Sequence, residues 1–365
     1  MKPVSALILY AQDSSNATFS YQYGWPRKFL SHPRFRCEAI NVRDSGWEAF
    51  LQRYRVLGRG EFDVVIILHS VFSNACYLRW RHLFFHAIKM SRVPKVYFIG
   101  NEYKLMPEKM AFCEALGVSL LVSLTDSQAI HALYRDRLGC AVAGIPSAGL
   151  DEEIYYPTVP FRERPVDIGY RSDESPIYLG HTERRDIAEY FSAHGPRHGL
   201  KVDISLKQSD RFGERKWAAF LNQCKAQLGT EAGGDYFELT DSTRKSCNQY
   251  VKQHPDAPSS EIIHRFFKGY PNPIPARMIS GRMVEAAGTK TAQILFEGHY
   301  GGYFKPDVHY IPLKKDFSNF AEVIEKFHDE EYCCAITDNA YDLVSQELTY
   351  DKLIDKFYEA LVPVL

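Results

Sequence analysis

The sequence predicts an α/β protein built from two doubly wound domains. Three observations support this prediction: a length of 365 residues, short apolar runs that alternate with amphipathic segments, and a proline-bearing break before the middle. A chain of this length corresponds to about two domains of 100–200 residues each. Apolar residues make up 45% and charged residues 24% of the chain, which excludes a largely disordered protein.

Five short apolar runs in the first 150 residues are expected to form the strands of the first domain. Continuous apolar runs of strand length are typical of strands buried on both faces of a parallel sheet. Helical segments alternate with them, and Pro107 and Ser127 favour helix starts. The expected strands are Ala6–Tyr10, Val64–Leu68, Val96–Ile99, Leu120–Leu124 and Ala141–Ile145, and the expected helices are Trp47–Tyr54, Arg81–Met90, Pro107–Leu116 and Ser127–Leu138.

A second α/β pattern follows a linker near Tyr156–Pro165, which mixes prolines with charges and has no apolar period. Asn319 and Glu322 have the spacing of a capping box at the start of one of the helices. The expected strands are Val166–Gly169, Ile177–Leu179, Val202–Ile204, Ala226–Leu228, Gln293–Phe296 and Tyr310–Leu313; the expected helices are Thr182–His194, Arg215–Leu221, Ile262–Phe267, Gly281–Ala287, Phe320–His328 and most of the tail from Asp338 to Leu361.

Composition narrows the class of protein. Lys and Arg number 44 against 45 Asp and Glu, a net charge of −1, so we expect no nucleic-acid partner. No apolar run approaches the ~18–20 residues of a membrane-spanning helix, and the N-terminus is interpreted as a first strand and not as a signal peptide. The eight cysteines are scattered, which favours reduced thiols and a cytoplasmic location. Aromatic residues make up 14% and are interpreted mainly as core, with a ring-stacking surface as the alternative.

Several catalytic signatures are absent from the sequence. It contains no G-x-G-x-x-G after the first strand, no G-x-x-x-x-G-K-[ST], no G-x-S-x-G and no H-E-x-x-H. This excludes the easily recognised dehydrogenases, P-loop enzymes, α/β-hydrolases and zincins.

Two segments of the second half combine glycines with a predicted helix start or strand end. In Ile177–Arg185 a Gly turn leads into a helix whose N-terminus favours an anion, and Arg184 or Arg185 could reach a phosphate. A capped helix with solvated charges is an equal alternative. In Leu228–Asp235 the glycines permit close approach of a ligand, and a plain turn is equally compatible with them.

A third segment carries the most information. Ser280-Gly281-Arg282 opens a helix that bears Glu285, and the strand after it leads to Glu297–Tyr303. Such a helix start can hold a diphosphate, and a carboxylate one turn further can accept two ribose hydroxyls. The alternative for Glu285 is an ordinary surface residue.

At this segment the sequence resembles the GT-B glycosyltransferases, in particular the group-1, family-4-like branch that includes spore-maturation-type glycosyltransferases. The resemblance is specific over about the last 140 residues and chiefly architectural before that. The matching segments are Gly281–Thr289, Gln293–Leu295, Tyr300–Ile311, Asp316–Asn319, Gly229–Asp235, Ile145-Pro146 and Gly149–Asp151.

The resemblance implies two Rossmann-like domains that face a central cleft. Residues 1–157 would bind the acceptor, residues 158–347 would bind the nucleotide-sugar, and a final helix over about 348–365 would pack back on the first domain. The expected donor is UDP- or GDP-linked, no metal or other cofactor is needed, and the acceptor is a glycan or lipid-linked sugar in cell-surface polysaccharide or glycoconjugate synthesis. Peripheral membrane association is compatible with such an acceptor.

The resemblance also implies a set of donor-binding residues. Glu285 matches the second glutamate of the paired-glutamate motif, which binds ribose, whereas the first falls at Arg277. That departure weakens the inference of a retaining mechanism. The expected donor residues are Arg184 or Arg185, Gly229, Glu231, Ser280, Gly281, Arg282, Glu285 and Lys290.

Acceptor activation requires a base from the first domain. The candidates at strand ends are His69, Glu102 and Asp13, and His69 has a suitable intrinsic pKa. The alternatives to a glycosyltransferase are a sugar-nucleotide epimerase or hydrolase on the same scaffold, or a non-catalytic nucleotide-sugar-binding module.

Overall fold

The computed structural model describes residues 2–12, 20–59, 62–78, 83–269 and 274–365. The chain forms two compact units. Unit 1 consists of residues 1–147, 237–244 and 350–365, and unit 2 of residues 148–236 and 245–349. Asp13 and the expected helix start at Arg81 lie outside the described residues.

Unit 1 is built on a six-stranded parallel sheet of order β2-β1-β3-β4-β5-β6. The fully buried apolar runs at β1, β3, β4 and β5 account for the inner strands of this sheet. All five strands expected for this half are confirmed, with ends shifted by one or two residues. The strands are β1 (Val4–Tyr10), β2 (Phe35–Asn41), β3 (Val64–Ile67), β4 (Lys95–Phe98), β5 (Leu120–Ser123) and β6 (Ala141–Gly144).

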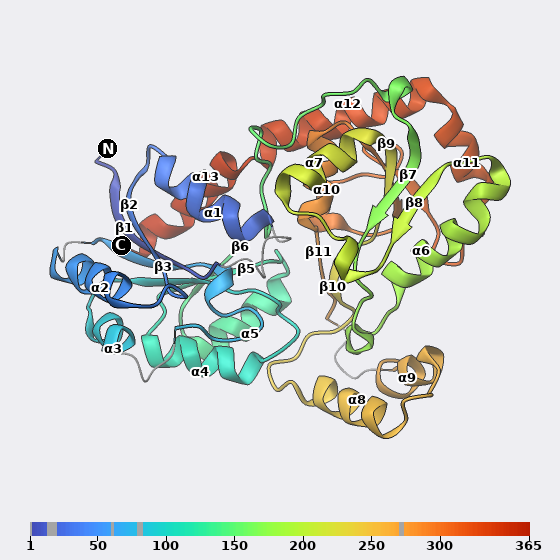
Figure 1. The fold of residues 1–365 in the computed structure, drawn as a ribbon. Coiled ribbons are helices and arrows are strands. Elements are labelled where there is room, and N and C mark those ends of the chain that lie inside the picture. Colours follow the sequence, from blue (N-terminus) through green and yellow to red (C-terminus); the bar gives the residue numbers. More distant parts are fainter. Residues whose placement is uncertain (1, 13–19, 60–61, 79–82, 270–273) are drawn as a thin grey trace. The chain divides into compact units, whose positions relative to one another are not determined.

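Helices cover both faces of this sheet (Figure 1), with α1 and the C-terminal α13 on one face and α2 to α5 on the other. Pro107 lies in the first turn of α4, and the Ser127 hydroxyl accepts from the Ile130 N–H at the start of α5, as the sequence predicts. The helices are α1 (Ser20–Ser31), α2 (Trp47–Arg59), α3 (Leu83–Met90), α4 (Met106–Leu116), α5 (Gln128–Leu138) and α13 (Tyr350–Leu361).

Unit 2 contains a five-stranded parallel sheet of order β13-β12-β9-β7-β8 and a two-stranded antiparallel ribbon, β10-β11. The sheet strands are β7 (Val166–Arg171), β8 (Val202–Ser205), β9 (Cys224–Gly229), β12 (Ala292–Phe296) and β13 (Ile311–Leu313), and the ribbon strands are β10 (Ala232–Gly234) and β11 (Ala276–Met278). The chain order places the topological switch between β7 and β9, because β8 lies on the other side of β7.

Figure 1 shows α6 and α11 on one face of this sheet and α7 and α10 on the other. Ile168, Phe191 and Val323 belong to the core that α6 and α11 close over the sheet. The helices are α6 (Glu183–His194), α7 (Glu214–Gln223), α9 (Ser259–Phe266), α10 (Gly281–Gly288), α11 (Phe320–His328) and α12 (Glu330–Glu347). Helix α8 (Ser242–Gln253) begins in a segment assigned to unit 1, and its residues from Lys245 onward are assigned to unit 2.

Two local predictions are wrong. Ile177–Leu179 forms a 3-10 turn instead of a strand, and Gly180 ends it with a φ of +87°. Asn319 does not cap α11 with its side chain, because its Oδ1 accepts the Lys314 N–H at 2.9 Å instead. In addition, α1, β2, the β10-β11 ribbon and α8 have no counterpart among the predicted elements.

Aromatic rings hold α13 against the sheet of unit 1. The centroid of the Phe357 ring lies 5.6 Å from that of Phe29 and 5.0 Å from that of Phe98, and Trp25 lies 5.2 Å from Phe98. All four side chains are at most 1% exposed. These four rings are core residues, in agreement with the interpretation that the aromatic residues belong mainly to the core.

Removing the Phe357 ring tests this role of α13. We expect Phe357→Ala to lower the free energy of unfolding by about 3–5 kcal/mol, because it opens a cavity among fully buried rings. Urea unfolding followed by circular dichroism measures the change. The matched control is Val362→Ala, since Val362 is 49% exposed just beyond the same helix and should change stability by less than about 0.5 kcal/mol. Equal effects of the two substitutions would contradict the packing role.

Candidate functional site

The candidate site of unit 2 lies at the carboxyl ends of β7 and β9. Ligands of open parallel sheets bind outside the strand ends at the topological switch point, which in this sheet is between these two strands. Beyond these ends the chain enters the N-terminus of α6, the loop before the β10-β11 ribbon and the N-terminus of α10. These segments supply two side-chain clusters, one rich in arginine and one built on a buried ion pair.

The first group, called the arginine cluster below, consists of Arg171, Arg184, Arg211 and Arg282. Arg184 Nη1 donates to Asp173 Oδ1 at 2.8 Å, and Arg211 Nη1 lies 3.6 Å from Asp173 Oδ2. The Asp173 carboxylate therefore lies between two guanidinium groups that come from α6 and from the segment before α7. A carboxylate held in this way occupies the kind of position that a phosphate would take.

Two members of the arginine cluster are fixed by backbone and ring contacts. The Arg171 guanidinium lies 4.5 Å from the centroid of the Phe220 ring, and its Nη2 donates to Asp203 Oδ1 at 2.6 Å. Arg282 donates to the carbonyl oxygen of Arg171. Burial, together with the positive charges of Arg211 and Arg184, lowers the pKa of Arg282 to about 10. An anion bound here would counteract that repulsion.

The start of α10 is tightly packed. A Cβ on Gly281 would lie 2.8 Å from the Ala148 Cβ, so a glycine is required at this position for the helix to begin here. One turn on, Glu285 is 4% exposed and its Oε2 accepts from Trp217 Nε1 at 2.7 Å. Ser280 is the N-cap residue but makes no side-chain cap hydrogen bond. Ser280, Gly281, Arg282 and Glu285 are thus together at one end of a buried helix.

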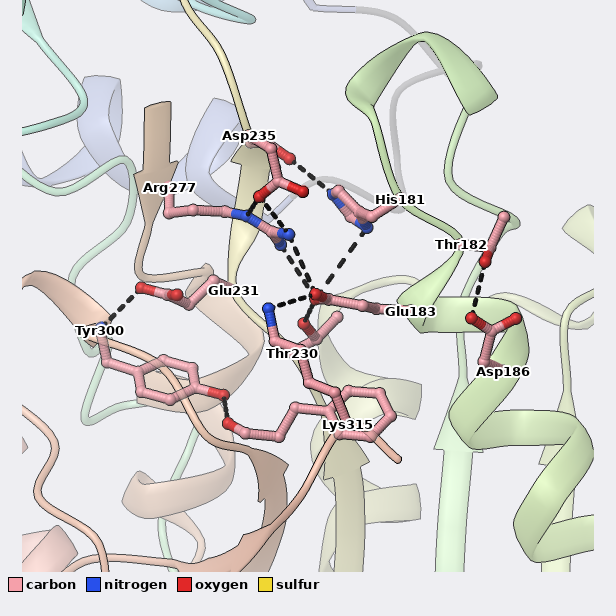
Figure 2. Close-up of polar contacts among 12 residues, drawn as sticks. His181, Thr182, Glu183, Asp186, Thr230, Glu231, Asp235, Arg277, Tyr300 and Lys315 are labelled. Atoms are coloured by element: carbon pink, nitrogen blue, oxygen red, sulfur yellow. Dashed lines mark hydrogen bonds and ion pairs between the residues drawn. The ribbon is translucent and has the colours of Figure 1, made fainter. Parts of the chain in front are cut away.

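The second group is centred on Glu183, the first residue of α6 (Figure 2). Arg277 from β11 makes a bidentate pair with it, from Nη1 to Oε2 and from Nη2 to Oε1, both at 2.9 Å. Lys315 Nζ lies 2.7 Å from Oε1, and the Thr230 hydroxyl donates to Oε2. On its other side Arg277 Nε donates to Asp235 Oδ1 at 2.8 Å. We call these five residues the Glu183 network.

Charge pairing sets the protonation states of this network. Burial by itself would raise the pKa of Glu183, but Arg277 and the other donors outweigh it and hold that pKa at about 2. Burial would lower the pKa of Arg277, yet Glu183 and Asp235 raise it. His181, whose Nδ1 lies 3.9 Å from Glu183 Oε2, has its pKa lowered by burial and then by the Arg277 charge. At neutral pH the pair is ionised and the imidazole is neutral.

This geometry explains how an arginine is tolerated where the resemblance expects a glutamate. The Arg277 side chain is 8% exposed, so its charge must be compensated locally. Glu183 provides a carboxylate from a different element, at the start of α6. The cluster therefore contains a buried carboxylate although position 277 is an arginine.

Two expected donor residues of the β9 loop have packing roles. A Cβ on Gly229 would lie 2.7 Å from Leu295 Cδ2, so a larger residue there would require the Leu295 side chain on the neighbouring strand to move. Glu231 is 8% exposed, and its Oε1 accepts from the Tyr300 N–H at 2.6 Å (Figure 2). Glu231 thereby ties the end of β9 to the loop that follows β12, beside the Glu183 network.

The structure separates Arg184 from Arg185 and places Lys290 elsewhere. Arg185 Nη2 donates to Ser259 Oγ at 3.2 Å and so points toward α9, while Arg184 joins the arginine cluster. Lys290 follows the C-terminal end of α10, the end opposite Gly281, and its Nζ lies 2.6 Å from Asp338 Oδ1. Neither Arg185 nor Lys290 is brought together with Arg282.

His69 lies at the corresponding switch point of unit 1, two residues after the last residue of β3. The side chain is 3% exposed and packs among the rings of Tyr21, Trp25 and Phe98, with centroids 5.8, 6.1 and 5.3 Å away. Within the described part of the chain, its Nε2 is a buried atom without a hydrogen-bond partner. Burial lowers the pKa of His69 to about 3, so the ring is neutral at physiological pH.

Glu102, another candidate base, is 1% exposed and fully engaged by donors. Its oxygens accept from Ser123 Oγ at 3.0 and 3.1 Å, from the Leu124 N–H at 2.5 Å and from the Tyr134 hydroxyl at 2.6 Å. Burial raises the pKa of Glu102. The carboxyl group connects β5 to α5 and contributes to the fold.

Six residues of the two clusters were not singled out by sequence reasoning. Three of them lie in or beside segments that were: Glu183 precedes Arg184, and Thr230 and Asp235 belong to the glycine segment at the end of β9. The signal that could have found Glu183 is Arg277, since a buried arginine requires an acid nearby. The six residues are Arg171, Glu183, Arg211, Thr230, Asp235 and Lys315.

The depressed pKa of Glu183 makes a prediction about acid stability. The ordinary pKa of 4.5 falls to about 2 in the folded state, so the network contributes stability that is present above pH 4.5 and is lost as the pH falls toward 2. We expect Glu183→Gln to lower stability at pH 7 and to flatten its decline between pH 4.5 and 2. Urea unfolding across this range is the measurement, and Glu189→Gln on the same helix, 68% exposed, is the control. The same pH slope in Glu183→Gln and the parent protein would contradict the assignment.

Two further findings concern membrane-spanning helices and cysteines. In the described part of the chain, no helix is both long and apolar enough to cross a bilayer. All eight cysteines have free thiols, and four of them are buried.

Comparison with known proteins gives a match in structure and none in sequence. No family model and no curated protein matches the sequence. Among solved structures, Anabaena HepE in complex with UDP-glucose is similar over 98% of this chain and 99% of its own, at 14% identity and a TM-score of 0.50. A glycosyltransferase from Rickettsia africae ESF-5 is similar over 100% and 99%, at 11% identity and a TM-score of 0.49.

The full-length similarity to HepE and the two parallel sheets of six and five strands both indicate an architecture of two α/β domains. Both sheets have the strand order of doubly wound domains, with a switch next to the first strand of each unit. The chain has the GT-B fold of glycosyltransferases.

Proposed function

We propose that this protein is a glycosyltransferase that moves a sugar from a nucleoside-diphosphate sugar to a hydroxyl acceptor. The observation that carries the proposal is the arginine cluster, in which Arg184 and Arg211 share the Asp173 carboxylate next to the half-buried Arg282. Convergent guanidinium groups at the switch point of a parallel sheet match the charge and the geometry of a diphosphate.

The leaving group explains how the arginine cluster promotes the reaction. A nucleoside diphosphate gains negative charge as the bond to the sugar breaks, and fixed positive groups stabilise that charge more in the transition state than in the ground state. Arg282 at the start of α10 and Arg184 at the start of α6 contribute full charges, and the helix N-termini add the partial charges of their N–H groups. None of these contributions requires a metal ion.

Ribose recognition is assigned to Glu285. Its Oε2 is held by Trp217 Nε1, and its Oε1 would lie 3.8 Å from a Cβ at Gly281, which places the carboxylate beside the N-terminus of α10. A carboxylate in that position can accept hydrogen bonds from two neighbouring hydroxyls. Because HepE was solved with UDP-glucose, a UDP-linked sugar is the first donor to test, with a GDP-linked sugar second.

The acceptor base is assigned to His69. Its imidazole lies at the strand ends of unit 1, and its Nε2 is a buried atom with no hydrogen-bond partner among the described residues. Burial lowers its pKa to about 3, far below the intrinsic value that made it a candidate, so the folded protein holds it as a weak base, and this role requires an acceptor hydroxyl to reach Nε2 directly. The acceptor is proposed to be a glycan or a lipid-linked sugar.

Loss of Arg184 tests the donor site. Arg184→Gln is expected to weaken binding of UDP or GDP by about 10–100-fold, because a hydrogen bond to a charged group is worth about 1.5–3 kcal/mol. Isothermal titration calorimetry measures the affinity. Arg197→Gln, an exposed arginine that follows the same helix, is the matched control and should bind normally. Unchanged affinity in Arg184→Gln, or an equal loss in the control, would remove the arginine cluster from the donor site.

Loss of His69 tests the acceptor base separately from donor binding. We expect His69→Gln to reduce transfer at least about 100-fold, the usual range for a general base, and to leave UDP affinity within about twofold. Product formation is followed by mass spectrometry against a panel of glycan acceptors. Full transfer activity in His69→Gln would exclude His69 as the base.

The alternative functions are separated by the same assays. Arg277 in place of a glutamate favours a module that binds nucleotide-sugar without turnover, and such a module would bind UDP but form no product with any acceptor. An epimerase or hydrolase would convert the nucleotide-sugar at full rate without an acceptor.

A further inference from the structure

Large apolar side chains are exposed together on helices α2 and α3. In the described part of residues 2–147, seven large apolar side chains are exposed, and six of them lie on these two helices, while the seventh is Leu30 on α1. Exposed apolar side chains that gather in one place indicate an interaction surface. The six residues are Trp47, Phe50, Leu51 and Tyr54 on α2, and Leu83 and Met90 on α3.

The apolar residues of α2 form a stripe that faces solvent. Their i, i+3, i+4, i+7 spacing is the one that faces the core in an ordinary amphipathic helix. In α2 the smaller Ala49 and Val56 are buried instead, and the first ring of the stripe, Trp47, is 70% exposed. The larger apolar face of this helix is therefore left for a partner. The α2 stripe consists of Trp47, Phe50, Leu51 and Tyr54.

The rings of the α2 stripe are ordered against one another. The Trp47 and Phe50 rings stack with centroids 5.3 Å apart and planes 12° apart, and the Phe50 and Tyr54 centroids lie 4.5 Å apart. Side chains that are already fixed lose little conformational entropy when a partner covers them. Trp and Tyr are also enriched among the residues that dominate the binding energy of protein interfaces.

The exposed charges beside this surface are balanced. Among the residues of 44–63 and 83–92 whose burial is described, three exposed side chains are acidic and three are basic. An anionic membrane or a nucleic acid selects a positive surplus, which these residues lack. A protein surface that carries both signs of charge matches them. The acidic residues are Asp44, Glu48 and Asp63, and the basic residues are Arg55, Lys89 and Arg92.

The stripe and the charges of α2 are complementary to themselves. In a twofold symmetric pair of antiparallel helices, a residue near one end of the contact lies opposite a residue near the other end. The α2 stripe begins with Trp47 and ends with Tyr54, so each of these rings would lie opposite the other kind in a second copy. Glu48 and Arg55 lie on one flank of the stripe, because seven residues bring a helix back to nearly the same side. The same symmetry would therefore place Glu48 beside Arg55 of the second copy, twice in each dimer.

We propose that this protein forms a twofold symmetric dimer in which α2 packs antiparallel against α2 of a second copy. Helix α3 contacts α2 on the same face of the sheet (Figure 1), and Leu83 and Met90, two turns apart on one side of α3, extend the apolar centre of the interface. An apolar centre with a charged rim is the usual anatomy of a protein interface. This inference rests on unit 1 alone and does not depend on the donor site or on the acceptor base.

Sedimentation velocity of the full chain tests this inference. We expect a dimer at about 50 µM, since interfaces of standard size have micromolar or tighter dissociation constants. Trp47→Ser/Phe50→Ser is expected to weaken dimerisation at least about tenfold through the loss of two rings at the centre of the interface. Leu30→Ser is the matched control, because it removes an exposed leucine from the other face of the sheet, and it should dimerise normally. Thermal melting shows that each variant is folded.

Charge reversal tests the antiparallel register. Glu48→Arg and Arg55→Glu, each alone, are expected to weaken dimerisation at least about fivefold, because each places two pairs of like charges across the interface. The double variant Glu48→Arg/Arg55→Glu is expected to regain the parent affinity within about twofold, since both pairs are restored with their signs exchanged. Residues seven apart are not neighbours within one helix, so this recovery requires contact between two copies.

Four outcomes contradict the proposal. A parent protein that sediments as a monomer at about 50 µM excludes the dimer. A dimer that Trp47→Ser/Phe50→Ser leaves unchanged uses another surface. A double charge reversal that dimerises as weakly as the single ones excludes the antiparallel register. A monomer that floats with phosphatidylglycerol vesicles, and loses that binding in Trp47→Ser/Phe50→Ser, assigns the surface to a membrane instead.

Discussion

The buried ion pair between Glu183 and Arg277 is the constraint on which the candidate site depends. Two charges removed from water are tolerated only if each meets a partner with good geometry. Here the bidentate pair joins the start of α6 to β11, and Lys315, Thr230 and Asp235 complete it from three other segments. Because those segments all leave the carboxyl ends of strands, the pair fixes where α6 begins, and with it the position of Arg184 in the arginine cluster.

The sequence predicts most of the fold because its inner strands are continuous apolar runs, whose pattern depends on local residues. The runs around Ile66, Val96 and Leu121 are buried on both faces, and each was located within two residues. Edge elements were not predicted because they lack such a run. Strand β2 is half exposed, and the β10-β11 ribbon has no apolar pattern, since its close packing depends on Gly233 lying against Ala276.

The candidate site was predictable where residues are neighbours in the chain and not where they meet in space. Ser280 to Glu285 were identified as a unit and lie together at the start of α10. The choice between Arg184 and Arg185 required the structure, since adjacent helix positions point in directions about 100° apart. Lys290 was proposed from closeness in sequence, but the length of α10 separates it from Gly281. Arg211 comes from a loop after β8, and no pattern in the sequence around it predicts that it lies close to Asp173.

The return of α13 to unit 1 has a consequence for biosynthesis. Phe357 completes the aromatic core around Phe29 and Phe98, yet all of residues 245–349 precede it in the chain. As the polypeptide emerges from the ribosome, one apolar face of the first sheet therefore lacks its cover by α13 until the other unit has been translated. Such an uncovered face is the kind of surface that binds chaperones or aggregates. The order of elements along the chain thus leaves the first-synthesised unit without α13 until residues 350–361 have been translated.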